Sequence, residues 1–66
     1  MWTYYHFTSN DGSTWTIHAL NVIYAWEKLS LCGATKKDGL RLVGYSLFDL
    51  GGYIYPMTAP RPAWLK

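Results

Sequence analysis

Hydrophobic and polar side chains alternate at the start of the chain, in two runs that a turn signal separates. Residues 2–8 are rich in aromatic and β-branched side chains, which favour a strand. The polar segment that follows contains Asp11-Gly12, and residues 14–18 then alternate again. We therefore predict a β-hairpin, in which Gly12 supplies the positive φ of a three-residue loop with a bulge.

The same alternation predicts the register of the hairpin. If the numbers of paired residues sum to 22, Tyr5 faces Ile17 and Phe7 faces Trp15 on one side of the sheet. The other side then collects the more polar set: Tyr4, His6, Thr8, Thr14, Thr16 and His18. A shift of one residue would mix the two sets, so the pattern specifies a sheet that is covered on one side only.

A helical pattern follows the hairpin. Asn21 is a favourable N-cap, and Gly33 stands where a left-handed C-cap belongs. Between them, apolar residues recur at helical spacing on one face: Val22, Ala25, Trp26, Leu29 and Cys32. We predict a helix over about residues 22–32, packed through this face on the apolar side of the hairpin. Its opposite face presents Tyr24, Lys28 and Leu31.

The second half of the chain has weaker patterns. Residues 40–47 indicate a third strand, and Gly44 within it indicates a bulge or a close backbone approach. Residues 48–52 form either a tight connection or a helical turn, and residues 53–55 are expected to be a short fourth strand, which Pro56 ends or places at an edge. We therefore predict an α+β fold of order β-β-α-β-β, with one helix on a small antiparallel sheet.

The predicted domain covers residues 1–57, and a Pro-rich tail covers residues 58–66. The spacing of Pro60 and Pro62 favours an extended conformation. The tail either docks onto a partner or folds back, with Trp64 over the core.

Composition changes this picture in one respect, because the chain has more rings than a small interior can hold. Of 66 residues, 18% are aromatic and only 15% are charged, against about 25% charged in an average domain. This composition excludes a disordered tail, and the length excludes a multi-domain enzyme. Some of the four Trp and six Tyr residues are therefore expected at a contact surface.

No group of residues indicates catalysis or a cofactor. His6 and His18 share a face and could begin a metal site, but zinc needs three or four ligands, and the alternative is a solvated pair. Cys32 could be a nucleophile only beside a base, and otherwise it is a small core residue. The aspartates lie in turns and connections. We predict a protein that is not an enzyme and binds neither a cofactor nor a metal.

Basic residues cluster once, at Lys36, Lys37 and Arg41. With Tyr45 nearby, this cluster is typical of a surface that binds single-stranded nucleic acid. The alternative is a solvated loop, and the net charge of +2 gives nucleic-acid binding little support.

Three features predict a cytoplasmic protein without a membrane segment. The lone Cys32 indicates a reducing compartment. The first residues lack the features of a signal peptide. The longest uncharged stretch, residues 12–26, contains Ser, Thr, His and Asn and is shorter than a membrane span.

A resemblance covers about residues 1–33. It is carried by Tyr5-His6-Phe7, Gly12, Trp15-Thr16-Ile17, Ala19, Asn21 and Ala25-Trp26-Glu27. This run resembles the strand-turn-strand-helix opening of small phage- and plasmid-encoded inhibitors of bacterial machinery, including anti-CRISPR proteins. The resemblance implies a cytoplasmic protein of the host cell that binds a larger bacterial protein or complex and inhibits it sterically.

Two surfaces are candidates for that contact. One is the outer helix face, with Tyr24, Lys28 and Leu31, and the other is the open sheet face, with Tyr4, His6 and His18. A nucleic-acid-binding module that uses Lys36, Lys37, Arg41 and Tyr45 is the alternative function. A homodimeric structural component is a further alternative.

Overall fold

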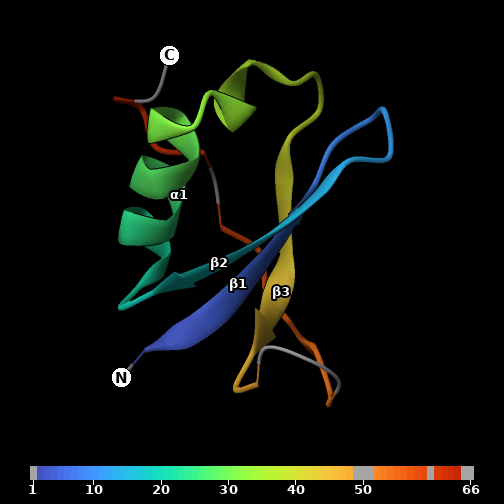
Figure 1. Cartoon of the computed structure of the whole chain (residues 1–66), viewed down its shortest axis with the longest axis vertical. Coiled ribbons are helices and arrows are strands. Elements are labelled where there is room, and N and C mark those ends of the chain that lie inside the picture. Colours follow the sequence, from blue (N-terminus) through green and yellow to red (C-terminus); the bar gives the residue numbers. More distant parts are fainter. Residues whose placement is uncertain (1, 49–51, 60, 65–66) are drawn as a thin grey trace.

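One helix packs on one face of a four-stranded antiparallel sheet (Figure 1). The structure, a computed structural model, describes residues 2–48, 52–59 and 61–64. Its elements are β1 (Thr3–Thr8), β2 (Thr14–Ala19), α1 (Val22–Leu31), the 3-10 turn η1 (Ala34–Lys36), β3 (Arg41–Ser46) and β4 (Tyr55–Pro56). The predicted α+β fold is confirmed, and along the chain η1 is added between the predicted helix and the third strand. None of the helices in the described ranges is long and apolar enough to cross a membrane.

The first hairpin has the predicted register. Tyr5 pairs with Ile17 and Phe7 pairs with Trp15, and Phe7 is 1% exposed. At the turn, the N–H of Gly12 donates to the carbonyl of Ser9 over 3.1 Å, and the φ of Gly12 is 86°. The three-residue loop and its left-handed glycine are thus as the Asp-Gly signal predicted.

The helix begins and packs as predicted but ends one residue earlier. The Oδ1 atom of Asn21 accepts the N–H of Tyr24 over 3.0 Å, which caps the first turn. On the buried face, the ring of Trp26 meets the ring of Phe7 edge-on at 4.9 Å. The prediction that Cys32 faces the core is wrong, because Cys32 is the C-cap of α1 and is exposed.

Strand β1 lies in the middle of the sheet, in the order β2-β1-β3-β4. The register between β1 and β3 shifts between His6 and Phe7. Beside this shift, a Cβ atom on Gly44 would lie 2.4 Å from the carbonyl oxygen of Tyr55. The predicted bulge and the predicted close approach at Gly44 are therefore both present.

The fourth strand is shorter and later than predicted. It comprises Tyr55–Pro56, so the predicted range of 53–55 is wrong. The ladder is short because proline has no N–H to donate, and it ends with a 3.4 Å hydrogen bond from Met57 to Val43. The predicted connection over 48–52 includes residues 49–51, which lie outside the described residues.

The segment after β4 returns toward the helix side of the sheet (Figure 1). Met57 and Ala59 are partly buried against the core. The guanidinium of Arg61 donates to the carbonyl oxygen of Thr35 in η1 over 2.6 Å. This segment therefore follows the fold-back alternative for the tail. Trp64, however, is 53% exposed and does not cover the core.

Candidate functional site

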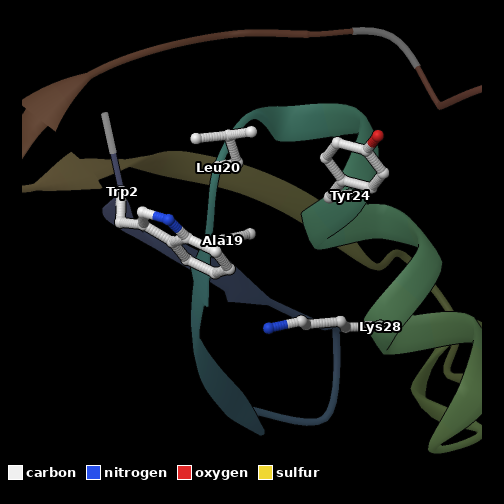
Figure 2. Close-up of a pocket in the computed structure, with 5 residues that line it drawn as sticks. All are labelled: Trp2, Ala19, Leu20, Tyr24 and Lys28. Carbon is white, nitrogen blue, oxygen red and sulfur yellow. The ribbon is translucent and has the colours of Figure 1, made fainter.

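An apolar hollow opens where β1 begins and β2 ends (Figure 2). Five residues line it, and we call it the Trp2 hollow: Trp2, Ala19, Leu20, Tyr24 and Lys28. Its volume is about 260 Å³. Trp2, Leu20 and Tyr24 are 54%, 44% and 50% exposed. Apolar side chains thus surround a concave surface that solvent reaches.

Local sequence rules build this hollow. The hairpin register ends with Thr3 opposite Ala19, and its continuation places Trp2 beside Leu20. Asn21 then starts α1 immediately, so the turn between strand and helix is short. Tyr24 and Lys28 are four residues apart and therefore lie on one helix face. The hollow forms where this face meets the end of the hairpin.

Lys28 joins the helix to the sheet at the rim of the hollow. Its Nζ atom donates to the carbonyl oxygen of His18 over 2.7 Å and lies 5.3 Å from the ring centroid of Trp2. An ammonium this close to an indole face is attracted by the ring electrons. Lys28 therefore helps to hold the Trp2 ring in place (Figure 2).

A short stack of rings continues from Trp2 along the open sheet face. The centroids of Trp2 and His18 are 5.2 Å apart, and their planes are tilted by 53°. His18 stacks on Tyr4 with centroids at 4.4 Å and planes within 12°. The Trp2 ring therefore contacts His18 of β2, which stacks on Tyr4 of β1, as well as Lys28 of the helix.

The two predicted contact surfaces therefore meet in part. Tyr24 and Lys28, from the helix face, lie at the same hollow as the Trp2 ring, which rests on His18 and through it on Tyr4. Leu31 is 82% exposed and does not line the hollow.

His6 belongs to a separate polar contact. Its Nε2 atom lies 2.7 Å from the Oγ atom of Ser46, and its Nδ1 atom lies 3.2 Å from the Oγ1 atom of Thr16. Both ring nitrogens thus have partners across the sheet. His6 links three strands and does not join the hollow.

Three of the five lining residues were not predicted from the sequence: Trp2, Ala19 and Leu20. The signal was available in the predicted register, because its continuation puts two large apolar residues, Trp2 and Leu20, beside each other at the open end of the hairpin. What the register could not indicate is the contact with Lys28, which depends on the angle between α1 and β2.

The basic cluster is used mainly within the protein. The Nζ atom of Lys37 pairs with Asp11 at 2.9 Å. The Nη1 atom of Arg41 donates to the carbonyl of Gly39 over 2.9 Å and to the side chain of Asn10 over 3.2 Å. Lys36 is exposed. Two of these three cations therefore fasten loops to each other.

Tyr45, the aromatic member of the nucleic-acid hypothesis, is partly buried against the core. Its ring stacks on Tyr55 at 5.3 Å. It lies near the end of β3, whereas Arg41 begins that strand. The cations and the ring are thus separated along the strand.

Asp11 is the anchor of the hairpin loop. The hydroxyl of Ser9 donates to its carboxylate, the backbone N–H of Ser13 donates over 2.9 Å, and Lys37 adds its positive charge. Together these donors hold the pKa of Asp11 well below its ordinary value, with Ser9 the largest contributor. The loop is a braced structural element.

The chemistry that the Trp2 hollow offers is contact with an apolar group beside a cation. Within residues 2–48, 52–59 and 61–64, no three His, Cys, Asp or Glu side chains come close enough to hold a metal ion.

Comparisons with protein-family models, with curated proteins and with solved structures find no match to this chain.

Proposed function

We propose that this protein is a non-enzymatic interaction protein of the phage or mobile-element inhibitor type. It binds a larger bacterial protein or complex through the Trp2 hollow and inhibits it sterically. The observation that carries the proposal is the position of Trp2, half exposed over an apolar hollow and held between Lys28 and His18.

The side chains at the hollow are of the kinds that dominate protein interfaces. Trp and Tyr are enriched among the residues that contribute most to binding, because they bury large areas at low entropic cost. Trp2 is already held by its neighbours in the free protein. Binding a partner therefore costs less free energy than it would if the Trp2 ring were mobile and had to be ordered on binding.

The openness of the hollow favours a protein side chain over a metabolite. Trp2, Leu20 and Tyr24 are each about half exposed, whereas small-molecule pockets enclose most of the surface of their ligand. One bulky apolar side chain of a partner fits such a space. The cation of Lys28 at the rim favours a carboxylate next to that side chain.

Affinity capture from a bacterial lysate, followed by mass spectrometry, tests the proposal. The wild type should recover one protein complex in fixed ratio. Trp2→Ala and Tyr24→Ala should each raise the dissociation constant by roughly 30-fold, the effect of losing about 2 kcal/mol at an interface centre, and recovery should fall accordingly. Tyr53→Ala is the matched control, because Tyr53 is 65% exposed and does not line the hollow.

Two outcomes would contradict the proposal. Undiminished recovery by folded Trp2→Ala and Tyr24→Ala variants would remove the hollow from the interface. Recovery that nuclease treatment abolishes would instead indicate the nucleic-acid alternative, and affinity should then fall steeply with salt.

A further inference from the structure

Strand β2 has an outer edge that pairs with no other strand in the described part of the chain. It is the terminal strand in the order β2-β1-β3-β4. The hydrogen bond from Ser9 N–H to the Ser13 carbonyl, 3.0 Å long, fixes which residues face inward. In an antiparallel ladder the direction alternates, so Thr14, Thr16 and His18 direct their N–H and C=O groups away from β1.

The open part of this edge is the half nearer the hairpin loop. At the other end, the carbonyl of His18 already accepts the ammonium of Lys28 over 2.7 Å. Thr14 and Thr16 are exposed, and the hairpin loop lies on the side of the molecule away from α1 (Figure 1). Four main-chain groups, two donors and two acceptors, are thus available for a further strand.

Nothing in the sequence of β2 protects this edge. Exposed edge strands usually carry Lys, Pro or a bulge that prevents pairing with another chain. Residues 14–19 contain no Lys and no Pro, and their pairing with β1 shows no register shift. Their Thr, Trp and Ile side chains favour strands.

We propose that the β2 edge pairs with the β2 edge of a second copy of this chain, antiparallel and around a two-fold axis. Thr14 of each copy exchanges both main-chain hydrogen bonds with Thr16 of the other. The axis then passes beside Trp15, which faces its own counterpart. The two four-stranded sheets become one continuous sheet of eight strands.

The side chains of β2 are complementary to themselves in this register. Trp15 and Ile17 are only partly buried in the single copy, although they lie on the helix side of the sheet. The proposed pairing brings the two Trp15 rings together at a non-hydrogen-bonded position, where side chains approach most closely. Aromatic pairs at such positions stabilise a sheet.

A second copy fits this edge better than an unrelated segment does. The open residues carry no charged side chain with which to select a partner of opposite sign. An edge that pairs with itself around a two-fold axis closes after two copies and leaves no edge of the same kind. The Trp2 hollow lies at the end of β2 away from Thr14 and Thr16, so this pairing uses other residues than the contact proposed above.

Proline at position 16 tests the pairing. Thr16→Pro removes the outward N–H and keeps the inward-facing residues of β2, and proline is tolerated on edge strands. Thr16→Val is the matched control, because both variants lose the 3.2 Å contact with His6 but only valine keeps the N–H. Sedimentation equilibrium of the purified chains over a range of concentrations measures the association.

The wild type and Thr16→Val should form dimers. Thr16→Pro should raise the dimer dissociation constant by roughly 30-fold or more, because two hydrogen bonds across the axis are lost. A wild type that stays monomeric at millimolar concentration, or a folded Thr16→Pro variant that dimerises as the control does, would overturn the proposal.

Amide hydrogen exchange gives a second readout that needs no variant. In the dimer, the N–H groups of Thr14 and Thr16 should gain protection as the concentration rises, while the exposed Leu31 region should not. Dimerisation without protection at Thr14 and Thr16 would place the contact elsewhere and contradict the proposal.

Discussion

The two hairpins of the sheet are held together in different ways. Strands β1 and β2 share a ladder of six residue pairs with a braced three-residue loop. Strands β3 and β4 share two pairs. In the first hairpin, side-chain alternation and turn chemistry agree. In the second, Gly44 allows the backbone of Tyr55 to approach closely, and the Tyr45 and Tyr55 rings stack.

This difference separates local information from tertiary information. A hairpin with alternating residues and an Asp-Gly turn is specified by its own sequence. A two-residue strand has too few hydrogen bonds to specify itself, so its position depends on what it packs against. The first hairpin and α1 should therefore retain their structure when the second hairpin is disturbed.

The largest effect should come from a substitution in the core between α1 and the first hairpin. Trp26→Ala takes away a ring that is 2% exposed and contacts Phe7. It should lower the free energy of unfolding by about 3–5 kcal/mol, enough to unfold much of a small domain. Chemical denaturation measures this loss.

Trp64→Ala is the control for that experiment, because Trp64 is half exposed and should change stability by less than about 0.5 kcal/mol. Equal effects of the two substitutions would show that the core is not centred on α1 and the first hairpin.

A smaller and more local effect is expected at Gly44. In Gly44→Ala the new Cβ atom would lie 2.4 Å from the Tyr55 carbonyl oxygen, so β4 must move away, at a cost of about 1–3 kcal/mol. Hydrogen exchange should speed up at the Met57 amide. Val43→Ala, at the exposed neighbour, should leave Met57 unchanged.

The contrast between the hairpins fails if Gly44→Ala also speeds exchange throughout β1 and β2. That result would mean that the sheet opens as a single unit.

The helix cap should have an effect of about 1 kcal/mol. Asn21→Ala removes the acceptor for the Tyr24 N–H, and thermal unfolding should show the loss typical of an N-cap. Asn21→Asp keeps an acceptor and should retain the wild-type stability. If alanine has no effect, the packing of α1 rather than its cap defines where the helix begins.

The smallest effect is expected at Asp11, whose ion pair with Lys37 joins the hairpin loop to the segment before β3. The folded-state pKa of Asp11 is lowered, so its stabilising contribution is full above the ordinary carboxyl pKa of about 3.9. That contribution is lost as the pH falls below this value toward the lowered folded-state pKa.

An NMR titration of the Asp11 carboxyl carbon measures this directly. Its midpoint should lie below 3.9 in the wild type and move upward in Ser9→Ala, because the hydroxyl of Ser9 contributes most to the shift. An unshifted midpoint in the wild type would show that the brace is open in solution.

The sequence predicted the first half of the fold well for a physical reason. Each strong signal there acts within a few residues: the alternation in β1 and β2, the turn at Gly12, and the cap at Asn21. The misplaced strand, β4, lies where no such signal exists. Cys32 was misassigned although Gly33, with its left-handed φ of 83°, marks the helix end beside it, because the apolar stripe was extended one residue too far. Cys32 stands at the margin of the apolar helix stripe, and the turn at Gly33 decides its exposure.

The candidate site was predicted in pieces. The outward position of Tyr24 follows from helical periodicity, and that of His18 follows from the strand register. Their common neighbour, Trp2, could be placed by the register, but its contact with Lys28 depends on how the helix crosses the sheet. Side-chain periodicity carries no information about that crossing angle.

The ammonium of Lys28 serves two partners at once, the Trp2 ring and the His18 carbonyl. A carboxylate that draws this ammonium toward itself leaves the His18 carbonyl without its donor. The part of the β2 edge whose main-chain groups are unpaired then extends to His18. Occupancy of the Trp2 hollow is in this way coupled to the hydrogen-bonding capacity of the β2 edge at the same end of the strand, through a single flexible side chain.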